Sequence, residues 1–126
     1  MMPTPTSASG FSLTTPATGE SLARTRYSEL ADVLLGCAGV ASGRRFGRDC
    51  LKLGRRPFIV LDRLALAFLT GSESERVMRA YPSAWLWNPN GERTPKHTWL
   101  ACLPHDQRLI CLLAELAYDC VSERAR

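Results

Sequence analysis

The chain lacks the long apolar run that a membrane-spanning helix requires. A span needs about 20 mostly apolar residues, whereas the longest candidate, Phe58 to Leu69, is shorter and contains Asp62 and Arg63. The first residues also lack an early Lys/Arg cluster and an apolar signal-peptide core. We therefore expect no membrane contact and no export, and a cytoplasmic location.

Closely spaced metal-ligand pairs are missing as well. The five cysteines are Cys37, Cys50, Cys102, Cys111 and Cys120. None forms a C-x-x-C pair with another, and only His97 and His105 could complete a metal site. Because a zinc site needs closer ligand pairs, we expect no metal, and reduced cysteines that fill core space.

Signatures of catalysis are equally scarce. The sequence contains no Gly-rich phosphate loop, no G-x-S-x-G turn and no helix with paired metal ligands. His105 and Asp106 are neighbours at an expected helix start, which favours a polar helix terminus over acid–base chemistry. Cys102 and His97 have no local signature of a nucleophilic pair. We therefore predict a protein that is not an enzyme and uses no cofactor.

What the chain does contain suits one small globular unit. It has 126 residues, of which 45% are hydrophobic and 22% charged, enough for a single core. Residues 1–24 are rich in Ser, Thr, Pro and Gly and predict a flexible tail. We expect a basic helical segment at 25–56 and a helical binding domain at 57–126.

The net charge of +4 is concentrated in the middle of the chain. The basic residues there are Arg44, Arg45, Arg48, Lys52, Arg55 and Arg56, against the single acid Asp49. A helix from about Ser28, a turn at Gly36 to Gly39 and a basic helix from about Ala41 to Leu53 predict a helix-turn-helix-like arrangement. The six basic residues are candidate DNA contacts; a solvated basic face is the alternative.

The second half of the chain predicts further helices. Pro57 stands where it can open a helix from Phe58 to Leu69, although Phe58 to Leu61 could be a buried strand. Ser72 with Glu75 reads as a capping box for a helix that ends near Tyr81. Pro95 predicts a short helix over 95–103. Together these segments predict an all-α fold of about five to six short helices.

The last predicted helix, from about His105 to Ser122, has an unusually wide apolar surface. Its apolar residues are Leu109, Ile110, Leu112, Leu113, Ala114, Leu116, Ala117, Cys120 and Val121. Only a narrow strip through Arg108, Glu115, Asp119 and Ser122 is polar. One neighbour needs an apolar arc of about 100° or slightly more, so we expect a second contact, either within the domain or with a partner.

The stretch from Leu64 to Tyr118 resembles the toxin-binding domain of Xre/MbcA/ParS-type antitoxins. It carries an apolar segment Leu64–Leu69, a short helix at 72–81, an aromatic segment with a Pro-Asn turn at 85–90, and an apolar last helix led by Arg108. In that family a helix-turn-helix lies upstream, where the basic block falls here. The Gly-Glu-Arg at 91–93 departs from the family pattern, and Gly43 and Gly47 interrupt the upstream helix.

The resemblance implies an antitoxin that masks a cognate toxin, typically a RES-domain toxin that degrades NAD. The candidate partner-binding residues are Trp85, Trp87, Asn88, Pro89, Asn90, Arg108, Leu112, Leu116, Arg124 and Arg126. Trp99 adds a third tryptophan to the same region. DNA is a second expected partner, and we expect a homodimer or hetero-oligomer. The alternative is a phage or mobile-element inhibitor or adaptor that binds a host defence or regulatory protein.

Overall fold

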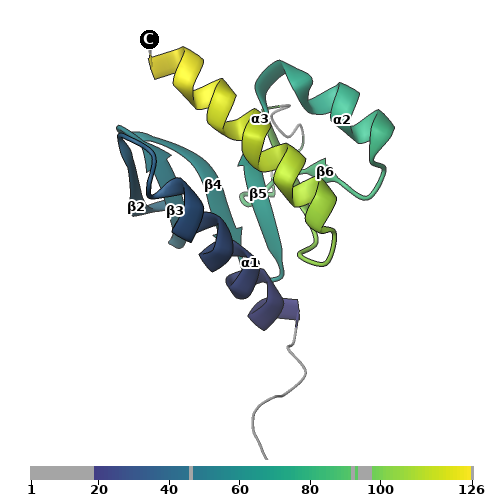
Figure 1. Ribbon diagram of the computed structural model, residues 1–126. Helices are drawn as coiled ribbons and strands as arrows, with labels where there is room; N and C mark the ends of the chain where they lie inside the picture. The colour runs from purple at the N-terminus through teal and green to yellow at the C-terminus, as the bar shows by residue number, and fades with distance from the viewer. Residues whose placement is uncertain (1–18, 46, 92, 94–97, 126) are drawn as a thin grey trace, which may run out of the picture.

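The computed structural model describes residues 19–45, 47–91, 93 and 98–125, without the side chains of Arg124 and Ala125. These residues form a six-stranded antiparallel sheet and three α-helices (Figure 1). The fold is therefore a mixed α/β fold, and the all-α prediction is wrong. The predicted tail at 1–24 falls outside the described residues up to residue 18, and its last part, from Gly19, is helical.

The elements follow one another along the chain in a simple order. The helices are α1 (Gly19–Leu34), α2 (Ser74–Ala80), which follows a single 3-10 turn η1 (Gly71–Glu73), and α3 (Gln107–Ala125). The strands are β2 (Val40–Arg45), β3 (Arg48–Leu53), β4 (Arg56–Asp62), β5 (Ala65–Leu69), β6 (Trp85–Leu86) and β7 (Trp99–Cys102). The order in the sheet is β2-β3-β4-β5-β7-β6, so β2 and β6 are its edges.

The predicted helix from Phe58 to Leu69 is instead the central hairpin β4–β5. Its two strands pair antiparallel, and Arg63 and Leu64 form the turn between them. Phe58 to Leu61 are all buried. A strand covered on both faces becomes a continuous apolar run, and this burial overrides the helix preference of the Leu- and Ala-rich sequence.

The predicted basic helix from Ala41 to Leu53 is a second hairpin, β2–β3. Ala41 pairs with Lys52 and Arg45 with Arg48 across it. Gly47 lies in the turn between Arg45 and Arg48, at φ +73°, a backbone angle that other residues rarely adopt. The helix-turn-helix prediction is therefore wrong for this segment. Because β3 pairs with β4, the sheet also runs across the expected boundary at residue 56.

Both long helices pack on the same face of the sheet (Figure 1). From α1, Ala23 and Tyr27 are buried against it. From α3, residues four apart, Leu109, Leu113 and Ala117, are fully buried. This spacing places one stripe of each helix on the sheet. The long last helix predicted from the sequence is present, and Asp106 caps it by accepting a hydrogen bond from the Leu109 N–H at 3.1 Å.

The region between β5 and β7 differs from its prediction in detail. The predicted helix near residues 72–81 exists as α2, but the Ser72–Glu75 capping box does not form. The Ser74 hydroxyl instead donates to the Gly71 carbonyl and lies 2.6 Å from the Thr70 hydroxyl. The short helix predicted over 95–103 is the strand β7 from Trp99, and residues 94–97 lie outside the described part. None of the described helices is long and apolar enough to cross a membrane.

Candidate functional site

A surface groove runs between α1 and α3, which lie beside each other on the sheet. We call it the helix groove and define it by Leu30, Val33, Leu34, Ile110, Cys111, Ala114 and Tyr118. Two adjoining hollows make it up, one of about 200 Å³ near Gln107 and one of about 360 Å³ near Tyr118. Leu30, Val33 and Cys111 line both, so the hollows form one continuous channel.

The helix groove has a buried apolar floor and an exposed apolar wall. Its floor is well buried, since Ile110 is 3% and Ala114 7% exposed. On the α1 wall, Val33 is 72% exposed, more than any other large apolar side chain of the described residues. Single exposed apolar residues are ordinary, but a continuous apolar channel is typical of an interaction site.

The charges on the groove rim are not balanced. At one end, the Arg26 guanidinium donates to the Glu29 carboxylate at 3.0 Å, so these two charges offset each other. At the other end, Glu115 and Asp119 stand one helical turn apart on α3, and both are exposed. Within the described residues neither has an ion-pair partner. The rim is therefore acidic at this end, although the chain as a whole carries +4.

Trp87 and Trp99 cover the opposite face of the sheet. Paired residues of small size run across neighbouring strands in one row: Gly43, Cys50, Val60, Ala67 and Ala101. Trp87, with 6% of its surface exposed, packs against this row, and its ring lies 5.2 Å from that of Trp99. Small side chains leave the depth that an indole ring needs.

A polar network fixes Trp87 in place. Its indole N–H donates to one Asp62 oxygen at 2.7 Å, and the Arg48 Nε donates to the other at 2.7 Å. All three side chains are buried or largely covered. Because each carboxylate oxygen accepts one of these hydrogen bonds, Asp62 ties β3 to the Trp87 ring and the network rigidifies this face. Trp87, a predicted partner-binding residue, is thus almost fully buried and holds this face of the sheet together.

The other predicted partner-binding residues are scattered. Trp85, 40% exposed, lies on the edge strand β6, and Asn88, Pro89 and Asn90 follow in the next turn. On α3, Arg108 is exposed and Leu112 and Leu116 are half-buried. These three residues do not line the helix groove, although α3 forms one of its walls. The Arg124 side chain and Arg126 lie outside the described residues.

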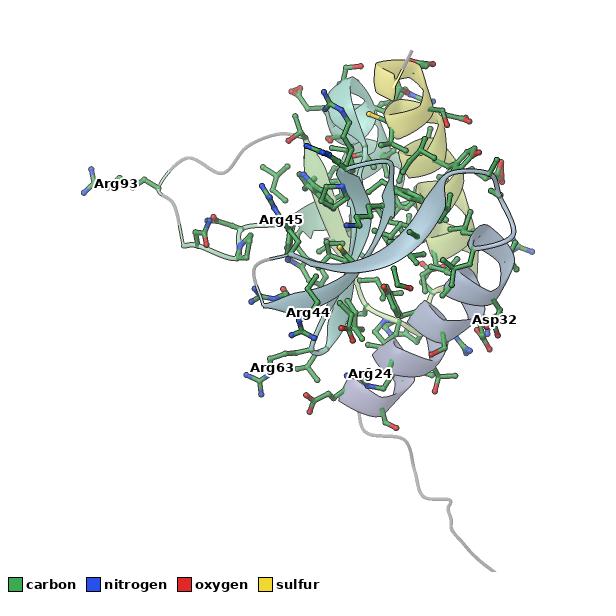
Figure 2. All side chains as sticks on the ribbon, turned by 90° about the vertical axis from the view of Figure 1, so that its left-hand side faces the viewer. Arg24, Asp32, Arg44, Arg45, Arg63 and Arg93 are labelled. Carbon is green, nitrogen blue, oxygen red and sulfur yellow. The ribbon has the colours of Figure 1, made fainter. Side chains whose placement is uncertain are left out.

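The structure gathers the predicted nucleic-acid residues on one hairpin and the turn after it. Arg45 and Arg48 are paired across β2 and β3, Lys52 lies further along β3, and Arg55 and Arg56 follow at the turn into β4. The Arg44 guanidinium forms an ion pair with one Asp49 carboxylate oxygen at 2.8 Å. The other Asp49 oxygen lies 3.6 Å from the Arg24 guanidinium. Figure 2 shows Arg24, Arg44 and Arg63 on the same side of the molecule, and these arginines line a hollow of about 160 Å³. No helix presents this block to DNA.

The cysteines and histidines form no reactive centre in the described residues. Cys50 and Cys102 are buried, and burial raises the pKa of both thiols, that of Cys102 to about 12. Such thiols stay protonated and unreactive at neutral pH. His105 is exposed and His97 lies outside the described part. Across the described residues, no three His, Cys, Asp or Glu side chains come together as a metal site.

Sequence reasoning found the last helix but missed the groove. The helix predicted from about Ser28 contains Leu30, Val33 and Leu34, but the sequence predicts it as the first helix of a helix-turn-helix. One signal was available: α1 needs only one stripe to cover the sheet, and Val33 lies beside that stripe. The pairing of α1 with α3 depends on the sheet between them, which the sequence pattern did not predict.

Comparison with known proteins adds no relative. No protein-family model, no curated protein and no solved structure matches the chain.

Proposed function

We propose that this protein binds another protein and masks a segment of it, and that the helix groove is the contact surface. The observation that carries this proposal is the continuous apolar channel between α1 and α3, with Val33 72% exposed on its wall. Exposed apolar surface of this kind is costly in water and is usually covered by a partner.

The proposal keeps the function predicted from the sequence and changes the surface. The antitoxin resemblance placed an apolar helix at Leu64 to Leu69, where the fold has a strand, and a DNA-reading helix where it has a hairpin. Its apolar last helix agrees with α3. A toxin neutralised by its antitoxin and a host protein blocked by an adaptor are both partners of the proposed kind.

Co-expression with the products of neighbouring genes tests the proposal, with the chain carrying an affinity tag. We expect one product to co-purify, and Val33→Lys to abolish that co-purification because a charge replaces apolar contact. The matched control is Ser28→Lys, which adds the same charge on the far side of the same helix. Circular dichroism and thermal unfolding verify that both variants fold.

Two results would contradict the proposal. A partner that co-purifies equally well with Val33→Lys does not use the helix groove. If Ser28→Lys reduces co-purification of the partner as much as Val33→Lys does, the added charge or a folding defect causes the loss, and not the groove.

A further inference from the structure

The helix groove also indicates what kind of segment it accepts. Resting on the proposed function, we propose that its occupant is an amphipathic helix of a partner protein, with basic residues beside its apolar stripe. Three features of the described residues support this inference: the absence of free backbone groups in the walls, the acidic end of the rim, and the length of the channel.

Both groove walls are helices, and this limits the backbone of the occupant. Within α1 and α3 the main-chain N–H and C=O groups bond to each other, so the walls offer an incoming strand no ladder. An extended segment on the apolar floor of Ile110 and Ala114 would leave its own backbone groups without partners. A helix satisfies those groups internally and needs only apolar side chains at helical spacing.

The charge of the occupant follows from Glu115 and Asp119. They stand one helical turn apart beside the wider hollow, and within the described residues no cation pairs with them. Lys or Arg residues one turn apart on the incoming helix would face them. Acidic residues at the same positions would repel them.

The chain itself is a poor source of this helix. Residues 1–18 contain Pro3, Pro5 and Pro16 and no charged residue, so this sequence cannot supply a basic amphipathic helix. In a second copy related by a two-fold axis along the groove, Glu115 and Asp119 would face their own counterparts. With the axis across the groove they would face the Arg26 end, where Arg26 already donates to Glu29 at 3.0 Å. Neither arrangement brings an unpaired cation of the groove lining to Glu115 and Asp119.

The length of the channel sets the length of the helix. Along α3 it extends from Gln107 to Asp119, which at 1.5 Å per residue is about 18 Å. About three turns of an incoming helix cover this distance, with apolar residues at i, i+3 or i+4, and i+7. The basic residues belong at the end that lies over Glu115 and Asp119.

Two synthetic peptides of about 14 residues test the inference. Both carry the same leucine stripe at helical spacing; one has lysines and the other glutamates on the polar face. Fluorescence anisotropy with the full chain measures their affinities. We expect the lysine peptide to bind roughly 3- to 30-fold more tightly, and the difference to shrink as salt rises.

Charge reversal on the protein provides the matched comparison. The double variant Glu115→Lys with Asp119→Lys is expected to lose or invert the preference for the lysine peptide. Asp32→Lys with Glu75→Lys makes the same net change away from the groove, on α1 and α2, and is expected to keep it; Figure 2 labels Asp32 on α1.

The inference and the proposed function can fail separately. Equal affinity for both peptides, or an equal shift with the control pair, overturns the basic helix and leaves the groove as a contact surface. Binding of neither peptide overturns the inference, while co-purification with Val33→Lys decides the proposed function independently. A dimer in light scattering that Val33→Lys dissociates would make a second copy the occupant and overturn the inference.

Discussion

The two faces of the sheet are covered by different means. On one face lie α1 and α3, whose packing leaves the helix groove between them, with an apolar floor and an acidic end. On the other face, Trp87 and Trp99 lie on a row of small side chains, and Asp62 fixes Trp87 by a hydrogen bond. The conspicuous tryptophan is thus a structural residue, whereas ordinary aliphatic residues of the helices form the candidate binding surface.

The largest effect should come from removing Trp87. Trp87→Ala uncovers the small-residue row and leaves one Asp62 oxygen without its donor, so we expect the free energy of unfolding to fall by about 3–5 kcal/mol. Urea denaturation measures it. Trp85→Ala, at a 40% exposed edge position, is the control and should cost less than about 1 kcal/mol. Similar losses for both would refute the structural role of Trp87.

Alkaline pH should destabilise the helix-covered face. Burial raises the pKa of Cys102 to about 12, from an ordinary value of 9.0. Above pH 9 the unfolded chain therefore releases a proton that the folded chain keeps, and stability falls as pH rises toward 12. We expect the unfolding free energy to fall by about 1.6 kcal/mol between pH 9 and 10.5, since the slope rises from about 0.7 to about 1.4 kcal/mol per pH unit over this range.

The variant Cys102→Ala separates this thiol from other groups. Its unfolding free energy should fall less steeply with pH over the same range. The remaining slope comes from Cys50 and, at the alkaline end, from Tyr27, because burial raises the pKa of both. An unchanged slope in Cys102→Ala would show that another group is responsible.

A smaller effect is expected from the carboxylate that holds Trp87. Asp62→Asn removes the charge that pairs with Arg48 at 2.7 Å and should lower the unfolding free energy by about 1–2 kcal/mol. The comparison is Asp49→Asn, which breaks the more exposed pair with Arg44 and should cost no more than about 1 kcal/mol. Chemical denaturation measures both, and the reverse order would contradict the network.

The smallest effect on stability belongs to the groove wall. Val33→Lys changes an exposed side chain and should alter the unfolding free energy by less than about 0.5 kcal/mol. The same denaturation series measures it. A loss as large as that of Asp62→Asn would mean that Val33 contributes to the core and not to a binding surface.

The helix at the end of the chain could be predicted because its whole pattern is local. Leu109, Leu113 and Ala117 repeat at helical spacing, and Asp106 precedes them as a cap. The central hairpin could not be predicted in this way, because Phe58 to Leu61 are all apolar and show no alternation of apolar and polar residues. Such a run fits a buried helix and a strand covered on both faces equally well.

The candidate site could not be predicted because it also depends on residues that are distant in the sequence. Val33 and Ala114 are far apart in the sequence, and only the sheet on which α1 and α3 pack brings them to one groove. The sequence alone did not place Trp87, since tryptophan is favoured both in cores and at interfaces. Its burial depends on Asp62, 25 residues earlier, and on the small residues of four other strands.

The affinity of the partner complex for two variants tests the central claim most directly. We expect Val33→Lys to weaken binding by about 30-fold or more, equivalent to about 2 kcal/mol, and Trp85→Ala to leave it within about 2-fold. Isothermal titration of both folded variants with the co-purified partner measures this. Loss of binding in Trp85→Ala with full binding in Val33→Lys would place the contact on the tryptophan face and contradict the account.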